Sequence, residues 1–189
     1  MPRNRFAEQL NWAGADDVPE NVPSACHESG GLPFWQAKTL EEMSASEWES
    51  LCDGCGQCCL IKLEDEDTGE IAVTRLACKL LDLGSCQCSG YASRQDHVPD
   101  CVKLGLDDIS RLSWLPGTCA YRLLYAGEPL RWWHPLVSGT PQTVFEAGVS
   151  IRGLAISESK VPEERFPAHI VGWIEPQKVA SGPSHSKRG

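Results

Sequence analysis

The chain has 189 residues, 41% of them apolar, which is enough for a single domain with a hydrophobic core. Its formal net charge of -9 at pH 7 comes without any basic stripe, so a nucleic-acid partner is disfavoured. No apolar run approaches the roughly 18 residues of a membrane span, and the N-terminus lacks the unbroken apolar stretch of a signal peptide. We therefore expect a cytoplasmic protein that binds neither nucleic acid nor membrane, and whose protein partner, if it has one, is unknown.

The sequence predicts one folded domain between two disordered segments. Residues 1–31 carry prolines and charges without hydrophobic periodicity, and Cys26 is interpreted as a stray thiol of this extension. The domain is expected over residues 32–176, beginning where large apolar side chains first appear. Residues 177–189 have low complexity and are predicted to form a disordered tail.

A helix is predicted to lead directly into a run of cysteines. Ser44 and Glu47 form a capping-box pattern, and Trp48 and Leu51 follow at helical spacing. This helix runs into Cys52, which is the first of four cysteines within eight residues.

A β-hairpin is predicted immediately after the cysteine run. Residues 60–63 and 70–74 are rich in strand-forming side chains, and they flank an acidic turn over residues 64–69 that ends in glycine. The turn lacks the regular alternation and the closing glutamate of a calcium-binding loop. We therefore expect a solvated hairpin tip rather than a cation site.

The second half of the chain is predicted to be mixed and irregular. Residues 75–105 show few signals of regular structure. Short helices are expected over residues 107–115, capped by Asp107, and over residues 119–125, with a strand over residues 149–156. Because helices and strands do not alternate as βαβ units, the fold class is α+β: a small, irregular, metal-stapled single domain with short helices and a β-hairpin.

Nine of the ten cysteines lie in the middle of the chain: Cys52, Cys55, Cys58, Cys59, Cys78, Cys86, Cys88, Cys101 and Cys119. In a reducing compartment, dense thiols more often bind metal or do redox work than form structural disulfides. Cys52-x-x-Cys55 followed by Gly56 has the form of a metal knuckle, in which a turn aims two sulfurs at one ion. All nine thiols are therefore candidate ligands, and the metal is Zn2+ or Fe, the latter including an iron–sulfur cluster.

The spacing leaves the number of metal sites open. One tetrathiolate site uses four thiols, whereas two such sites, or one iron–sulfur cluster plus one zinc site, would use eight. Cys58 and Cys59 are adjacent and tend to point in different directions, so one of the pair serves a second metal or none. Cys86-x-Cys88 is a further candidate pair.

Other chemistries have less support in the sequence. A dithiol redox site also uses CxxC, but that motif follows a strand and opens a helix, whereas here the predicted helix precedes the motif. Structural disulfides become the best interpretation only for an exported chain. His97 is the histidine best placed for a mixed site, while His134, in an aromatic-rich loop over residues 129–136, is interpreted as a core residue. No catalytic pattern stands out.

The cysteine run Cys52-x-x-Cys55-x-x-Cys58-Cys59 is similar to the signature of the CxxCxxCC family of zinc- or iron-chelating proteins, and within that family to the YcgN-like bacterial group. The resemblance covers residues 32–175 and is also carried by residues 33–36, 47–51, 86–88, 99–101, 114–116, 118–123 and 133–136. It implies cytoplasmic metal chelation through the cysteines, and it supplies neither the choice of metal nor a substrate.

The sequence thus predicts a metal-chelating, cysteine-cluster protein of unassigned biological role. Two alternatives stay open, an iron–sulfur redox, sensor or cluster-maturation component and a thiol–disulfide redox protein. If the chain chelates metal, the free energy of metal binding contributes to the stability of the folded state. Residues 52–119 are therefore expected to be poorly ordered without metal.

Overall fold

The computed structural model describes residues 31–174. The N-terminal extension expected over residues 1–31, apart from Gly31, lies outside the described residues, together with Cys26 and the tail expected over residues 177–189. Three short helices open the described part of the chain, α2 (Phe34–Ala37), η1 (Leu40–Glu42) and α3 (Ala45–Ser50).

Helix α3 is capped as the sequence predicts. The Ser44 backbone N–H donates to Glu47 Oε2 at 2.8 Å, and the Glu47 backbone N–H donates to Ser44 Oγ at 3.3 Å. This reciprocal pair satisfies two of the amide groups that a helix leaves unpaired at its start. The helix ends at its C-cap residue Leu51, so it delivers the chain to Cys52.

The main sheet is built on strand β2 (Ile71–Ala77), which pairs with all three other strands. Strand β1 (Leu60–Glu64) and strand β6 (Ile170–Ile174) are antiparallel to β2, while β5 (Ile156–Ser157) is parallel to it. The pairing of β1 with β2 confirms the predicted hairpin.

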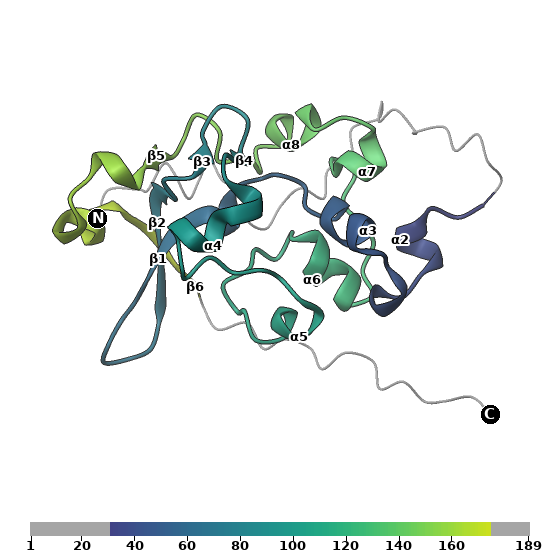
Figure 1. The fold of residues 1–189 in the computed structure, drawn as a ribbon, viewed down its shortest axis with the longest axis horizontal. Coiled ribbons are helices and arrows are strands. Elements are labelled where there is room, and N and C mark those ends of the chain that lie inside the picture. Colours follow the sequence, from purple (N-terminus) through teal and green to yellow (C-terminus); the bar gives the residue numbers. More distant parts are fainter. Residues whose placement is uncertain (1–30, 175–189) are drawn as a thin grey trace.

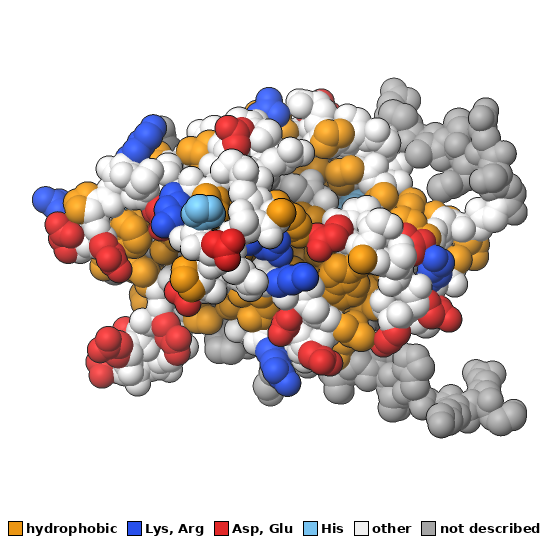
Figure 2. All heavy atoms as spheres, in the orientation of Figure 1, with side chains coloured by type: hydrophobic (Ala, Val, Ile, Leu, Met, Phe, Trp, Pro, Cys, Tyr) orange, Lys and Arg blue, Asp and Glu red, His pale blue; other side chains and the backbone are white. Residues whose placement is uncertain are grey.

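The tip of this hairpin is acidic and exposed, as predicted. Figure 2 shows red acidic side chains gathered there, at the lower left. Asp65 Oδ1 accepts hydrogen bonds from the backbone N–H groups of Asp67 and Thr68, at 3.1 and 2.8 Å. The carboxylate therefore stabilises the turn itself.

The remaining elements are short: η2 (Gln57–Cys59), β3 (Leu81–Asp82), β4 (Gln87–Cys88), η3 (Tyr91–Ser93), α4 (Arg94–His97), α5 (Leu106–Ile109), α6 (Ala120–Tyr125), α7 (Pro135–Ser138), α8 (Gln142–Glu146), η4 (Glu158–Lys160) and η5 (Glu163–His169). Figure 1 shows the main sheet on one side of the molecule and helices α2, α3, α6 and α7 on the other. The fold class is α+β, as expected. Within residues 31–174, no helix is long and apolar enough to span a membrane.

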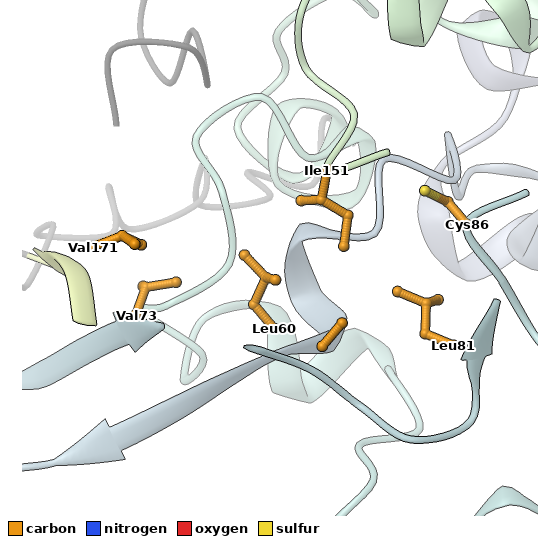
Figure 3. Close-up of a cluster of buried hydrophobic side chains, with 7 residues drawn as sticks. Leu60, Val73, Leu81, Cys86, Ile151 and Val171 are labelled. Atoms are coloured by element: carbon orange, nitrogen blue, oxygen red, sulfur yellow. The ribbon is translucent and has the colours of Figure 1, made fainter. Parts of the chain in front are cut away.

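The buried side chains form three clusters. The sheet cluster comprises Leu60, Val73, Ala77, Leu81, Cys86, Ile151 and Val171, most of them labelled in Figure 3. The helical cluster comprises Leu51, Ile109, Ala120, Tyr121 and Leu130. The tryptophan cluster comprises Cys55, Trp133, Val144 and Val149.

The structure corrects the helix expected over residues 107–115. Helix α5 begins one residue earlier, because the Asp108 carboxylate accepts the Gly105 backbone N–H at 2.9 Å, and it ends at Ile109. The chain beyond it turns, and the Arg122 guanidinium donates to the Leu115 carbonyl at 2.6 Å. A side chain from α6 thus takes the place of continued helical bonding.

The strand expected over residues 149–156 is also wrong for most of its length. Only Ile156 belongs to a strand, β5, while residues 149–151 and 155 are irregular and residues 152–154 form a turn. Gly153 has a left-handed φ of 78°, which interrupts an extended path. The aromatic-rich segment 129–136 was expected as a loop, but Pro135 opens helix α7.

Candidate metal centre

The cysteine run over residues 52–59 connects the helical cluster to the sheet cluster. Leu51, directly before the run, is fully buried in the helical cluster, and Leu60, directly after it, is buried in the sheet cluster. Burial of these leucines fixes both ends of the run, so the thiols between them have a defined path.

Two glycines let the run turn sharply. Gly54 and Gly56 have φ values of 71° and 78°, in the left-handed region that side chains rarely adopt. A Cβ at Gly56 would lie 2.7 Å from Ile151 Cγ1, whereas one at Gly54 would meet nothing within 4 Å. The Ile151 N–H also donates to the Cys55 carbonyl at 3.0 Å. The second turn is therefore held against the sheet cluster.

His134 holds the other side of the run and is a packed core residue. Its ring is 1% exposed, and Nδ1 accepts the Leu136 N–H at 3.1 Å. That bond leaves Nε2 as the donor to the Leu51 carbonyl, at 3.0 Å. Burial lowers the pKa of His134, which keeps the ring neutral. Because both ring nitrogens are used, His134 is not free to bind metal in this arrangement.

The first thiol set consists of Cys52, Cys55, Cys58 and Cys119, which all lie close enough to the Asp53 carboxylate for its charge to raise their pKa values. Asp53 Oδ1 accepts the Cys55 backbone N–H at 3.0 Å, which ties the carboxylate to the turn. Cys119 arrives from the start of α6, whose Ala120 packs with Leu51 in the helical cluster. Three of these thiols thus come from the run and one comes from 61 residues further along the chain, counting from Cys58 to Cys119.

Most thiols of the first set resist ionisation. Cys52 is exposed at the surface, yet desolvation by the surrounding protein, with the charges of Cys58, Asp53 and Cys119 nearby, raises its pKa to about 12. Burial and the Asp53 charge likewise raise the pKa of Cys55, and that of Cys119 to about 12. Cys58 differs, because a hydrogen bond from Cys59 lowers its pKa to about 7, with help from the Lys62 charge.

The second thiol set consists of Cys59, Cys78, Cys88 and Cys101, all of them half-buried. Cys78 lies at its centre. Burial raises the pKa of Cys78, and the charges of Glu158, Cys101 and Cys88 are close enough to raise it further. Cys59 lies close enough to Cys78 for the same effect. The two thiol sets meet at Cys58 and Cys59, whose sulfurs are 4.0 Å apart.

Two sequence candidates lie elsewhere. Cys86 is 7% exposed and belongs to the sheet cluster, where Figure 3 shows its sulfur pointing toward Ile151. Its Sγ is 3.5 Å from the Ser150 hydroxyl. His97 is exposed at the end of α4. Cys86 and Cys88, expected as a pair, therefore have different surroundings.

Among the described residues, no three His, Cys, Asp or Glu side chains converge closely enough to hold a metal ion. The sulfurs of each set are neighbours without being arranged around one point. An ion bound by either set would have to draw them to about 2.3 Å from the metal, in tetrahedral geometry.

Asp53 has a buried oxygen with no partner. The residue is 8% exposed, and within residues 31–174 its Oδ2 has no hydrogen-bond partner. A buried carboxylate oxygen of this kind is costly unless a donor or a cation satisfies it. Its position among four thiols identifies a place where positive charge is needed.

Lys62 supplies one positive charge between the two thiol sets. Its ammonium donates to the carbonyls of Gln57, Cys58 and Leu60, at 3.2, 2.7 and 2.8 Å. The nitrogen lies 4.5 Å from the centre of a Trp114 ring. Burial lowers the pKa of Lys62 to about 8, while the nearby Cys58 and Cys59 charges oppose that shift. Lys62 thus provides a single positive charge close to three thiols, Cys55, Cys58 and Cys59.

These residues fit a thiophilic metal ion. The first thiol set combines four sulfur donors with a carboxylate oxygen in a place where burial opposes negative charge. A bound cation offsets that charge and stabilises the thiolate form of each ligand. Zinc and iron–sulfur clusters both accept four thiolates.

Comparison with known proteins agrees with this donor set. Residues 51–120 match the CxxCxxCC family model, described as a "Putative zinc- or iron-chelating domain". The match includes all nine described cysteines. The class is therefore that of a metal-chelating, cysteine-cluster protein.

The chain belongs to the UPF0260 family. It is 56% identical over 142 residues to the UPF0260 protein of Rhizobium etli, a match covering 75% of this chain and 90% of that relative. It is 56% identical over 141 residues to a UPF0260 protein of Nitrobacter hamburgensis, covering 74% of this chain and 82% of the relative. It is 52% identical over 155 residues to a UPF0260 protein of Sinorhizobium medicae, a match covering 82% of this chain and 99% of the relative. No solved structure matches the chain.

Sequence reasoning missed Asp53 and Lys62. Asp53 stands inside the CxxC turn, where an aspartate commonly bonds a backbone N–H two residues on, and that position was a usable signal. Nothing in the sequence indicated that Lys62 would lie near the thiols, because a lysine in a hairpin strand is ordinarily exposed to solvent. Lys62 is half-buried, next to the irregular pairing between Leu60 and Lys62 in β1.

Proposed function

We propose that this protein chelates zinc or iron through the first thiol set, Cys52, Cys55, Cys58 and Cys119. The observation that carries the proposal is the buried, unpartnered oxygen of Asp53 among these four thiols. Four sulfurs and one oxygen that lack compensating positive charge are the donor set of a thiophilic cation, in the reducing environment of the cytoplasm where thiols remain free.

Metal binding at this site releases protons, because thiolates rather than thiols are the ligands. Cys58 is the thiol that loses its proton most readily, since its pKa is about 7. Of the four thiols, Cys58 therefore has the smallest cost of ionisation when a metal binds, and protons must also be displaced from the other three. Lys62 offsets part of the negative charge that remains after binding.

The arrangement does not favour a thiol–disulfide function for the pair Cys52 and Cys55. An attacking thiol of a CxxC redox pair has a lowered pKa, near or below neutrality. Here desolvation raises the pKa of Cys52 to about 12, and the pKa of Cys55 is raised as well. At neutral pH both thiols of this pair are protonated, so they are poor nucleophiles, whereas a bound metal would stabilise their thiolate forms.

Metal and acid-labile sulfide analysis of the full chain, purified without oxygen or chelator, tests the proposal. We expect stoichiometric zinc or iron, and sulfide accompanies the iron if the metal is an iron–sulfur cluster. Cys55→Ser and Cys119→Ser are expected to lose the metal of this site, while Cys86→Ala is the matched control because Cys86 lies in the sheet cluster. A wild-type chain without metal, or a Cys119→Ser variant with undiminished metal, would contradict the proposal.

A further inference from the structure

We propose that the second thiol set, Cys59, Cys78, Cys88 and Cys101, is a separate tetrathiolate site that binds its own thiophilic metal ion. The inference extends the proposed function, because it assigns a second ion to the same domain. It uses none of the four thiols of the first set, so each site can be tested alone.

The backbone brings Cys59 and Cys78 together. The Cys78 N–H donates to the Cys59 carbonyl at 2.9 Å, next to the paired residues Leu60 and Ala77 at the ends of β1 and β2. Cys59 therefore leaves the cysteine run on the side of the sheet, while Cys58 stays with the first set. The two adjacent cysteines are divided between the two sets.

A small hairpin folds Cys88 back toward Cys78. The Leu81 N–H donates to the Cys78 carbonyl at 2.9 Å, and Leu81 of β3 pairs with Cys88 of β4. The Ser89 N–H closes the hairpin on the Leu80 carbonyl at 2.8 Å. Cys78 and Cys88, which are ten positions apart in the sequence, thereby lie near the same end of this hairpin.

Cys101 completes the set from the segment after α4. Its N–H donates to the Val98 carbonyl at 2.9 Å, and Gln95 donates from its side chain to the Cys101 carbonyl at 3.2 Å. These bonds anchor the backbone of Cys101, whose thiol is close enough to Cys78 for their charges to interact. Cys59 at the end of η2, Cys88 of β4 and Cys101 thus all have Cys78, which directly follows β2, as a common neighbour.

Cys86 is excluded from the second set by its backbone. In a regular strand, residues two apart point to the same face, and that alternation would pair Cys86 with Cys88. Cys86 instead has a φ of 56°, a left-handed value that breaks the alternation. Its sulfur turns into the sheet cluster, and Cys88 remains half-buried outside it.

The two sites are neighbours that share a counter-charge. The Cys58 and Cys59 sulfurs are 4.0 Å apart. Since zinc–thiolate bonds are about 2.3 Å long, ions bound through these two sulfurs lie within roughly 9 Å of each other. Lys62, bonded to the Cys58 carbonyl, interacts with the charges of Cys55, Cys58 and Cys59 and so faces both sites.

Anaerobic Co2+ titration of the metal-depleted full chain counts the sites. Thiolate-to-cobalt absorption is expected to saturate at two ions per wild-type chain. Cys101→Ser and Cys119→Ser are each expected to reduce this to one ion, from different sites, and Cys86→Ala is expected to retain two. Saturation of the wild-type chain at one ion, or a Cys101→Ser variant that still binds two, would overturn the second site.

The same titration separates the two proposals. If the wild-type chain binds one ion and only Cys119→Ser loses it, the proposed function stands and the second site does not. If Cys101→Ser loses an ion while Cys119→Ser keeps both, the second site stands and the first assignment fails.

Thiol alkylation of the purified wild-type chain tests the second site without any substitution. Cys78, Cys88 and Cys101 are half-buried, so they are open to reagent unless a metal holds them. We expect mass spectrometry to show their alkylation at least tenfold faster after chelation than before it. Equal rates before and after chelation would contradict the second site, whatever the folding behaviour of the variants.

Discussion

At the scale of single residues, the site depends on groups that adjust charge around the thiols. Asp53 adds negative charge and leaves one buried oxygen unpartnered. Lys62 adds a positive charge that three backbone carbonyls hold in place. If the thiols bind a metal as proposed, these two residues would contribute to the net charge of the bound form.

Replacing Lys62 tests this role. Lys62→Met removes the buried positive charge beside the thiolates, so we expect metal affinity to fall about tenfold, equivalent to about 1.4 kcal/mol. Lys62→Arg keeps the charge and is expected to retain most of the affinity. Competition with a metallochromic chelator measures the change, and Lys103→Met, at an exposed lysine, is the control.

An affinity of Lys62→Met equal to that of the control would show that the charge of Lys62 does not stabilise the bound metal. If Lys62→Arg lost as much affinity as Lys62→Met, the three carbonyl contacts rather than the charge would be responsible.

At the scale of elements, local signals predicted some structures and not others. The capping pattern of Ser44 and Glu47 located α3, because the bonds that start a helix lie within four residues. The hairpin of β1 and β2 was equally readable from its two strand-forming runs and acidic turn. In contrast, residues 149–155 include β-forming side chains but are irregular, with Ile151 packed against Gly56 and a turn at Gly153.

The allocation of the cysteines could not be predicted for a similar reason. Spacing shows which thiols are close in sequence, but it does not show which way each one points. Cys59 lies beside Cys78 through a backbone hydrogen bond while its sulfur stays 4.0 Å from that of Cys58, and Cys86 turns inward at a positive φ. Both effects depend on tertiary contacts that lie outside the motif.

The close approach at Gly56 gives a prediction for the turn that carries Cys55 and Cys58. Gly54→Ala and Gly56→Ala both place a side chain at a left-handed φ, at about 1 kcal/mol each. Only Gly56→Ala also forces a Cβ to within 2.7 Å of Ile151, so we expect it to destabilise the protein by at least about 1 kcal/mol more than Gly54→Ala. Urea denaturation of the metal-bound chains measures the difference.

Gly56→Ala should also lower metal content more than Gly54→Ala does, because moving the turn displaces thiols of the first set. Equal stability and equal metal content of the two variants would mean that the contact between Gly56 and Ile151 does not position the turn.

At the scale of the whole molecule, the backbone of the cysteine run connects the helical half to the sheet half. The sheet cluster and the helical cluster are separate groups of buried side chains, and the cysteine run passes between them. Most elements outside the main sheet are six residues or shorter, so few of them are stable by themselves. Metal binding that draws Cys119 of the helical side to the run, and Cys88 and Cys101 to the sheet side, would therefore stabilise the arrangement of the whole domain.

Native mass spectrometry of the full chain, purified anaerobically and measured before and after chelation, tests this account most directly, because one spectrum reports both bound mass and compactness. We predict a compact chain that carries the mass of bound zinc or iron, less the protons displaced from the thiols. Chelation should remove that mass and shift the chain to the higher charge states of an expanded protein. A chain that carries no metal before chelation, and keeps the same charge states after it, would contradict the account.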